Sequence, residues 1–153
     1  MRHDNDPAVI SDLLHTPATW AVVGLGDNPY RTAYSVSRWL VDELGIKLVP
    51  VHPSGAKVLG FEGYAHLADI PDGTTVDVVD FFVNSARVGA CVDEAIAEKD
   101  RLGITALWLQ IGVIDHDAAA RAREAGLAVV MDTCPKVEWH RIMPGDGARA
   151  VVG

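Results

Sequence analysis

Trp-Ala-Val-Val-Gly-Leu-Gly-Asp-Asn-Pro-Tyr-Arg-Thr-Ala-Tyr-Ser-Val-Ser-Arg-Trp-Leu, residues 20–40, is the stretch of sequence that decides the fold. Its valine-rich start ends at Gly24, a polar loop follows, and helical spacing of apolar side chains begins at Tyr34. This order predicts a strand, a glycine loop and a helix. In an open α/β sheet, such a loop lets a ligand approach the backbone, and the helix N-terminus offers N–H groups to a phosphate. The stretch therefore predicts either a site for a phosphate-bearing ligand or a tight turn without one.

The glycine loop differs from the commonest phosphate-binding loops. A dinucleotide fingerprint needs G-x-G-x-x-G, but here Gly24 and Gly26 are followed by Pro29 in the third place. Proline has no N–H to donate. The chain contains no Gly-Lys-Ser or Gly-Lys-Thr, which excludes a nucleotide triphosphate loop. The loop instead carries Arg31, a cation that can hold a pyrophosphate through two hydrogen bonds.

Size, charge and cysteine content narrow the function further. The 153 residues suffice for one domain with a proper core, but not for the two domains of a typical nucleotide-dependent oxidoreductase. The net charge of −8 argues against general nucleic-acid binding, which needs a basic face. No apolar run is long enough for a bilayer and the start has no signal-peptide core, so we expect a cytoplasmic protein without a membrane partner. Cys91 and Cys134 lie far apart without paired metal spacing, so we expect neither a disulfide nor a metal site.

Strand-like and helix-like segments alternate along the chain. A helix is expected within residues 1–17, with Asn5 or Asp6 as its cap and Pro7 at its first position. The other segments predict strands at 19–24, 46–51, 76–82, 104–110 and 127–131, helices at 33–44, 86–101 and 115–125, an irregular segment with a short helical turn at 56–72, and a flexible tail at 144–153. This alternation predicts the α/β class, with a single domain over residues 1–153 and a five-stranded, mainly parallel sheet that has helices on both faces.

Short motifs at the strand ends resemble one known family. They are Val22-Val23-Gly24-Leu25 with Asp27-Asn28-Pro29 and Arg31, Val51-His52-Pro53, Leu59-Gly60, Leu67-Ala68-Asp69-Ile70-Pro71, Val76-Asp77-Val78-Val79-Asp80, Trp108-Leu109-Gln110-Ile111-Gly112, Met131-Asp132-Thr133-Cys134-Pro135-Lys136 and Glu138-Trp139. Over nearly the whole chain, their order resembles the small stand-alone CoA-binding proteins, which are similar in fold to the N-terminal domain of the succinyl-CoA synthetase alpha subunit. The resemblance implies a Rossmann-like domain that holds coenzyme A across the carboxyl ends of its strands.

The resemblance also implies which residues meet the coenzyme. The implied contacts are Gly24, Leu25, Gly26, Asp27, Asn28 and Arg31 at the pyrophosphate, Val51, His52 and Pro53 at the adenosine end, Lys57 at the 3′-phosphate, and Phe82, Asn84 and Gln110 along the pantetheine path. The chain departs from the family pattern at Gly26, where many relatives carry serine, and at Ala33, where a hydroxyl is also common. These departures bear on the affinity for CoA more than on the location of the site.

Several of these residues also have a purely structural explanation. Arg31 is either a ligand contact or a solvated loop residue, and His52 is either a ligand contact or a cap of its strand. Phe82 fits a core position better, because aromatic side chains on buried strands usually pack in the core. A structural role is equally open for Lys57, Asp27 and Asn28, the last two being good turn residues.

The chain offers no recognisable catalytic group. The synthetase relatives transfer a phosphoryl group through a histidine in a further domain, together with a partner subunit, and no such domain fits within these residues. The sequence has no serine nucleophile elbow and no His-Glu-x-x-His. Asp77 and Asp80 lie on one strand at an odd spacing, which puts them on opposite faces. We therefore expect no catalytic residues.

The sequence accordingly predicts non-catalytic binding of coenzyme A or an acyl-CoA. One alternative is a regulatory partner of a CoA-ligase-type enzyme, which would sense redox state if Cys134, near the crevice, formed a mixed disulfide with the CoA thiol. Otherwise Cys134 is a small buried hydrophobe. A second alternative is an NAD-binding enzyme, disfavoured because Val51-His52-Pro53 stands where a ribose-binding acid is expected. Storage, sensing and regulation stay open, as does a homodimer.

Overall fold

Five strands form one sheet in the computed structural model, which describes residues 5–143. Their order across the sheet is β2-β1-β3-β4-β5, and every neighbouring pair is parallel. The sheet, predicted to be mainly parallel, is thus parallel throughout. The strands are β1 (Thr19–Val23), β2 (Lys47–Val51), β3 (Val78–Phe81), β4 (Ala106–Leu109) and β5 (Ala128–Val130).

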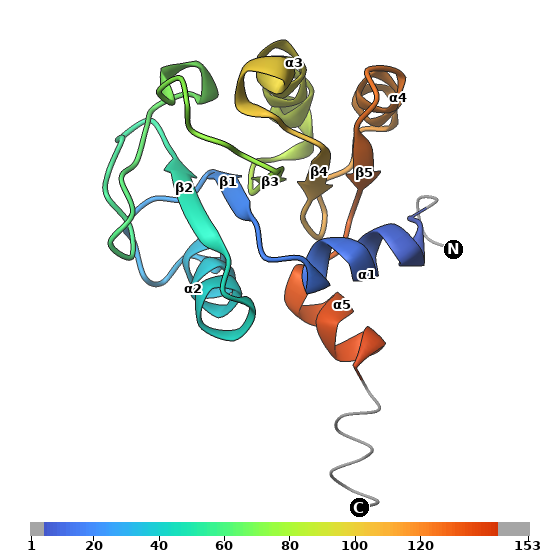
Figure 1. Cartoon of the computed structure of the whole chain (residues 1–153), viewed down its shortest axis with the longest axis horizontal. Coiled ribbons are helices and arrows are strands. Elements are labelled where there is room, and N and C mark those ends of the chain that lie inside the picture. Colours follow the sequence, from blue (N-terminus) through green and yellow to red (C-terminus); the bar gives the residue numbers. More distant parts are fainter. Residues whose placement is uncertain (1–4, 144–153) are drawn as a thin grey trace, which may run out of the picture.

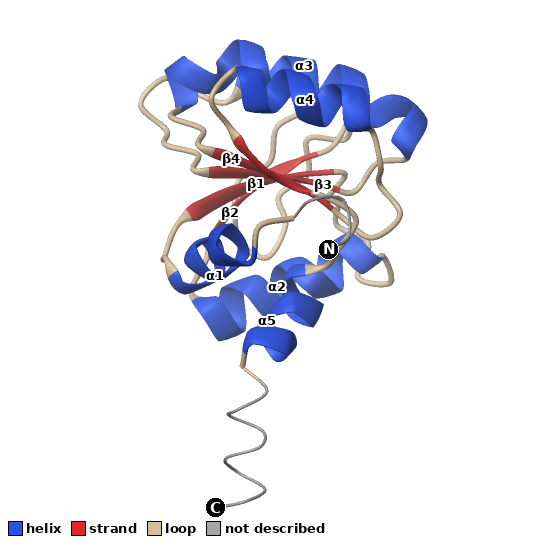
Figure 2. Cartoon of the chain, turned by 90° about the vertical axis from the view of Figure 1, so that its right-hand side faces the viewer, coloured by secondary structure: helices blue, strands red, loops and turns tan. Residues whose placement is uncertain are grey.

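Helices cover both faces of the sheet, as the sequence predicted. They are α1 (Pro7–His15), α2 (Thr32–Leu44), α3 (Ser85–Leu102), α4 (His116–Glu124) and α5 (Pro135–Ile142), with a short 3-10 helix at Leu67–Asp69. Figures 1 and 2 show α3 and α4 on one face and α1, α2 and α5 on the other. Each face packs its own apolar core: Val79 and Leu107 belong to the first, and Val22 and Trp108 to the second. None of the described helices is both long and apolar enough to cross a bilayer.

Local sequence signals set the helix ends at the predicted places. The side chains of Asp6, Asn84 and Asp115 accept hydrogen bonds from backbone N–H groups in the first turns of α1, α3 and α4. Gly45 closes α2 with a φ of 68°, a left-handed conformation that glycine adopts without Cβ strain. The predicted strands and helices therefore agree with the structure to within two residues at each end.

One helix was absent from the sequence interpretation, which ended the regular structure at the fifth strand. The helix α5 corrects it, and Pro135 at its first position is the signal that could have revealed it. The Trp139 ring on α5 lies 5.0 Å from the His15 ring of α1 and 6.4 Å from the Trp39 ring of α2. Packing against these two helices stabilises a segment too short to be helical alone. The predicted flexible tail, 144–153, lies outside the described residues.

The strand order creates a crevice between the carboxyl ends of β1 and β3. The chain leaves β1 for α2 on one face of the sheet, whereas it leaves β3 for α3 on the other face (Figure 1). The two loops therefore diverge. In open α/β sheets, ligands bind outside the strand ends at this reversal of direction. The glycine loop directly after β1 lies at its edge.

Candidate functional site

Two adjoining cavities lie along the carboxyl ends of β1, β3 and β4. The first has a volume of about 240 Å³ and is lined by Gly24, Arg31, Thr32, Ala33 and Phe82. The second has a volume of about 280 Å³ and is lined by Thr32, Phe82, Gln110, Ile111, Val113 and Cys134. Because Thr32 and Phe82 line both, the cavities adjoin, and we call them together the groove. The groove runs from the glycine loop to the start of α5.

Gly24 brings the backbone at the end of β1 against the backbone at the end of β3. Its φ is 99°, and its N–H donates to the Val51 carbonyl at 2.7 Å. A Cβ at this position would stand 3.1 Å from the carbonyl carbon of Phe82 and closer still to the oxygen. Only glycine fits here. The close packing of the strands therefore requires Gly24, whatever the groove binds.

The rest of the glycine loop leads directly into α2. The Asn28 side chain accepts a hydrogen bond from the Tyr30 N–H at 3.0 Å, and the Asn28 carbonyl accepts one from the Arg31 N–H at 3.2 Å. Leu25 is fully buried, so only its backbone can reach a ligand. Arg31 is the N-cap residue of α2, and its exposed side chain makes no cap hydrogen bond. Arg31 thus lines the first cavity next to the first turn of α2, and a cation together with the free N–H groups of a helix start attracts anions.

The end of β2 packs against the same loop. The His52 ring lies 3.2 Å from the point where a Cβ on Gly26 would stand. Its Nδ1 lies 2.9 Å from the hydroxyl of Ser54. A serine at position 26 would therefore press on the His52 ring. Lys57 lies farther along and forms an exposed ion pair with Glu62 at 3.9 Å, a contact worth little in water.

A buried carboxyl lies behind the groove. Asp80 of β3 is 0% exposed, and its Oδ1 accepts a hydrogen bond from Nε2 of Gln110 at 2.7 Å. The strand register places Asp80 between Val22 of β1 and Trp108 of β4, both fully buried. Burial raises the pKa of Asp80 to about 8, although hydrogen bonds from Gln110 and from the backbone of Phe81 lower it. The carboxyl is therefore mostly protonated at neutral pH.

Two further predicted residues occupy helix starts. Cys134 is buried at the N-cap of α5, where it lines the groove and its side chain makes no cap hydrogen bond. Asn84 caps α3, and its side-chain oxygen accepts from the Arg87 N–H at 3.0 Å. Asn84 does not border the groove. Its position is therefore explained by the helix it caps.

The groove brings together only part of the predicted set. The predicted residues that line it are Gly24, Arg31, Phe82, Gln110 and Cys134. Those that do not are Leu25, Gly26, Asp27, Asn28, Val51, His52, Pro53, Lys57 and Asn84. The sequence interpretation did not name Thr32, Ala33, Ile111 and Val113 as contacts. Their position directly after a parallel strand and its loop was the signal available for them.

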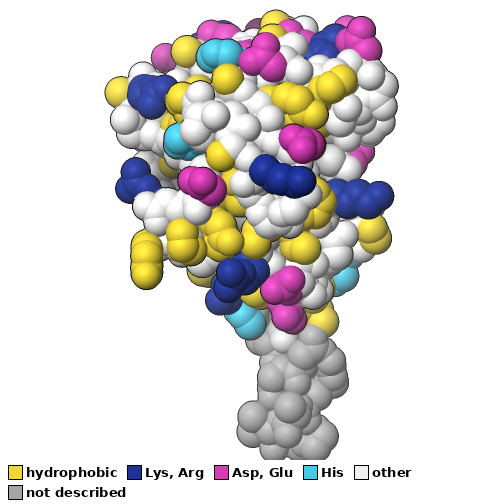
Figure 3. All heavy atoms as spheres, turned by 90° about the vertical axis from the view of Figure 1, so that its left-hand side faces the viewer, with side chains coloured by type: hydrophobic (Ala, Val, Ile, Leu, Met, Phe, Trp, Pro, Cys, Tyr) yellow, Lys and Arg dark blue, Asp and Glu magenta, His cyan; other side chains and the backbone are white. Residues whose placement is uncertain are grey.

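Charged side chains of both signs are interspersed on the face beside β2 and α2, as Figure 3 shows. That face presents no broad basic surface of the kind that follows a nucleic-acid backbone. Within residues 5–143, no group of three or more His, Cys, Asp or Glu side chains is placed to hold a metal ion. Arg31, which the sequence analysis predicted as a cation of the glycine loop, lines the groove.

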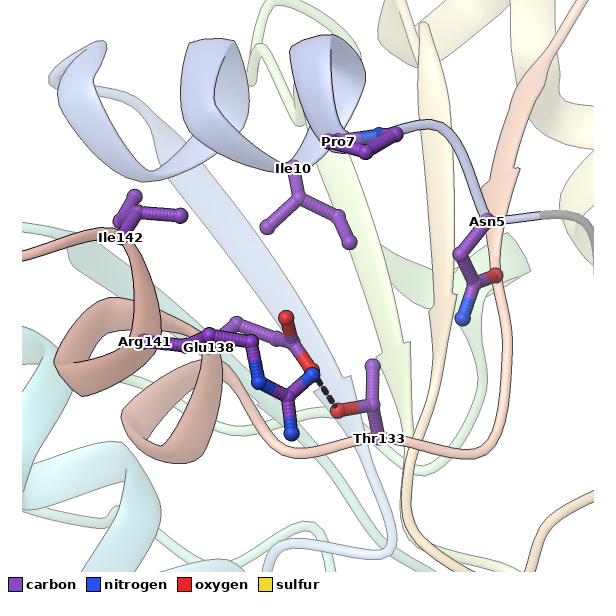
Figure 4. A pocket seen from close by; sticks show the side chains of 7 residues that line it. All are labelled: Asn5, Pro7, Ile10, Thr133, Glu138, Arg141 and Ile142. Atoms are coloured by element: carbon purple, nitrogen blue, oxygen red, sulfur yellow. Dashed lines mark hydrogen bonds and ion pairs between the residues drawn. The ribbon is translucent and has the colours of Figure 1, made fainter. Parts of the chain in front are cut away.

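A larger cavity, of about 330 Å³, lies between α1 and α5 (Figure 4). It is lined by Asn5, Pro7, Ile10, Thr133, Glu138, Arg141 and Ile142. The buried Glu138 carboxylate accepts hydrogen bonds from the Thr133 hydroxyl and, at 2.7 Å, from Arg141. The bond with Thr133 fixes α5 to the turn after β5, whereas Arg141 belongs to α5 itself. None of the ligand contacts predicted from the sequence lines this cavity.

Comparisons with known proteins address the family of the chain. The family model described as the CoA binding domain matches residues 18–140. The uncharacterized protein YneT of Bacillus subtilis is 34% identical over 130 residues, which cover 85% of this chain and 91% of that protein. The structure of a hypothetical protein from Pyrococcus horikoshii is 31% identical with a TM-score of 0.79, over 92% of this chain and 94% of that one.

A larger enzyme shares the fold. It is the dinucleotide-forming acetyl-coenzyme A synthetase 1 of Ca. Korarchaeum cryptofilum, which is 22% identical with a TM-score of 0.62. The match covers 77% of this chain and 26% of that one. The likeness shows that the same fold also occurs as one part of a much longer chain.

Proposed function

Because this chain belongs to the CoA-binding domain family, we propose that it binds coenzyme A or an acyl-CoA in the groove at the carboxyl ends of β1, β3 and β4. Membership of the family supports an association with CoA in general. The observation that carries the finer proposal is the shape of the groove. It has an anion-attracting end at the start of α2 and a largely apolar end beside Gln110 and Cys134. A ligand with phosphates at one end and a thiol-bearing arm at the other suits this arrangement.

The phosphate end of the ligand lies at the glycine loop in this proposal. The N–H groups at the start of α2 and the Arg31 guanidinium would hold the pyrophosphate. His52 and Pro53 would flank the adenosine, and Lys57 would approach the 3′-phosphate, since all three lie on the chain just after β2. Phosphate contacts near an acidic chain need such local cations, because the net charge of −8 repels an anion at long range.

The pantetheine arm then follows the groove past Phe82 to Gln110 and Cys134. The wall there is largely apolar, with Phe82, Ile111 and Val113, and the side-chain amide of Gln110 supplies a polar group. We propose binding without catalysis, because the groups that line the groove hold no paired acid and base and no activated nucleophile. An acyl group on the thiol would meet Cys134 first.

One observation favours a second candidate function, a redox-sensing regulator of a CoA-ligase-type enzyme. Cys134 lines the apolar end of the groove, where the CoA thiol would arrive. A mixed disulfide there would make occupancy depend on the redox state. Simple reversible binding needs no such bond, and it stays the primary proposal.

Calorimetric titration with CoA, dephospho-CoA and NAD tests the proposed function. We expect CoA to bind most tightly, dephospho-CoA less tightly because it lacks the 3′-phosphate, and NAD least. Native mass spectrometry of the purified protein provides an independent measurement, because a retained ligand would be identified by its mass. Tightest binding of NAD, or no binding of CoA, would overturn the proposal.

A further inference from the structure

We propose that Asp80 is a positioning residue, which holds the Gln110 amide by its nitrogen so that the amide oxygen faces the groove and accepts an N–H of the ligand. The inference rests on the proposed function, because the N–H donor it assigns is an amide of the pantetheine arm. It adds a selection rule to that function. The groove would favour a ligand that donates a hydrogen bond at Gln110 over one that only accepts there.

The geometry behind Gln110 is fixed by burial. Gln110 is 4% exposed, and its Nε2 donates to Oδ1 of Asp80 at 2.7 Å. This oxygen can accept the hydrogen bond in either state of the carboxyl, because the neutral acid can carry its proton on Oδ2. Asp80 is held in turn by its place in the central strand, with Val22 and Trp108 packed on either side. Gln110 therefore has a rigid partner on its inner side.

The outer side of the same amide is open to the groove. No hydrogen bond within residues 5–143 reaches the Gln110 side-chain oxygen. That oxygen is also not among the buried side-chain atoms of the described part that lack a partner, which are Trp20 Nε1, Ser37 Oγ and Asp80 Oδ2. It is thus the polar atom that Gln110 offers to the groove. An amide oxygen accepts and cannot donate, so its ligand partner must carry an N–H or O–H.

In the structure, the amide nitrogen of Gln110 is the atom that faces Asp80. Beside Asp80, the Val22 side chain has no polar atom and the Trp108 Nε1 donates to the Thr133 carbonyl, so neither side chain offers the nitrogen an acceptor. If the amide turned round, its NH₂ would face the groove and the site would prefer a ligand carbonyl. The two orientations therefore predict opposite ligand preferences, which a binding experiment can separate.

The test uses CoA and two analogues, in each of which one pantetheine amide N–H is replaced by an ester oxygen. We expect the wild-type protein to bind one analogue roughly 10-fold more weakly than CoA, because the Gln110 oxygen is left without a donor. In Gln110→Met, which keeps the length of the side chain, CoA and both analogues should bind equally. In Asp80→Leu, the amide nitrogen of Gln110 loses its acceptor and can turn toward the groove, so the discrimination should fall to a few-fold.

The ratio of affinities is the decisive readout, because a change that only loosens the core weakens CoA and its analogues alike. Circular dichroism and thermal unfolding of each variant establish that it is folded before titration. Equal binding of CoA and both analogues by the wild type would overturn the inference alone. Full discrimination in Asp80→Leu would show that Asp80 does not position the amide, and would overturn that part of the inference. Failure of the wild type to bind CoA at all would overturn the proposed function, and the inference with it.

Discussion

The carbonyl of Phe82, just after β3, lies against Gly24, just after β1, so closely that a Cβ on Gly24 would stand 3.1 Å from the Phe82 carbonyl carbon. The two residues also line the same part of the groove. The wall of the groove is therefore continuous with a close backbone contact between the ends of β1 and β3. We therefore expect substitutions at this contact to lower the free energy of unfolding more than they lower the affinity for a ligand.

Replacing Gly24 with alanine should destabilise the protein by about 3–4 kcal/mol, because the methyl group meets backbone as well as a φ of 99°. Gly126→Ala is the matched control: its φ is 92°, but nothing lies within 4 Å of its Cβ position. This control should lose only the stability that a side chain costs at a positive φ, which is about 1–2 kcal/mol. Urea unfolding of both variants measures the difference. Equal losses would show that the contact with Phe82 relaxes at little cost.

Arg31 should contribute to ligand affinity more than any other exposed arginine near α2. Arg31→Ala should weaken CoA binding by about 1.5–3 kcal/mol if the guanidinium holds the pyrophosphate, which is roughly a 10- to 150-fold rise in Kd. Arg38→Ala changes the net charge equally, yet Arg38 lies over the Tyr34 ring on the exposed side of α2. Calorimetry should show little change in this control. A similar loss of CoA affinity in both variants would mean that Arg31 acts only through its charge and makes no specific contact with the pyrophosphate.

The fold was largely predictable because the sequence marks both the buried strands and the helix starts clearly. Continuous apolar runs marked the buried strands, and Asp6, Asn84 and Asp115 marked helix starts through caps that the structure contains. The sequence interpretation failed at α5, whose helical stability comes from the rings of Trp139 and its tertiary neighbours rather than from local propensity.

The candidate site was less predictable, because a motif places a loop but not the direction of its side chains. Leu25 lies in the glycine loop, yet it is fully buried. Asn84 lies near the crevice, yet its side chain is used to cap α3. The link between Asp80 and Gln110 joins residues that are 30 positions apart, and only the register of β3 and β4 brings them together. No local pattern in the sequence carries that information.

Asp80 should make stability depend on pH in an unusual direction for an aspartate. Its pKa is about 8 in the folded protein against an ordinary value of 3.8, so between these values the folded state keeps a proton that the unfolded state has lost. The free energy of unfolding should therefore fall as pH rises from about 4 to about 8, by up to about 1.4 kcal/mol per pH unit, and then level off.

The Asp80→Asn variant isolates this dependence of stability on pH, because the asparagine side chain has the same shape as aspartate but does not titrate. Urea unfolding at pH 5, 6, 7 and 8 should show the wild type losing stability relative to the variant at each step. Parallel curves for the two proteins would mean that Asp80 titrates in the folded state near its ordinary pKa. Asp77, which lies outside the strand and accepts a hydrogen bond from the Thr19 N–H at 2.9 Å, offers a control at Asp77→Asn. That control should keep the slope of the wild type.

The chain has two cysteines, and only Cys134 lines the groove, so oxidised CoA should modify them unequally. In the reaction, the Cys134 thiolate attacks one sulfur of the CoA disulfide, a mixed disulfide forms, and the second CoA leaves as its thiolate. Burial raises the pKa of Cys91, which disfavours its thiolate. Intact mass after incubation should show one CoA adduct in the wild type and in Cys91→Ser, and none in Cys134→Ser. An adduct that survives Cys134→Ser, or no adduct in any protein, would end the redox-sensing alternative and leave reversible binding as the function to test.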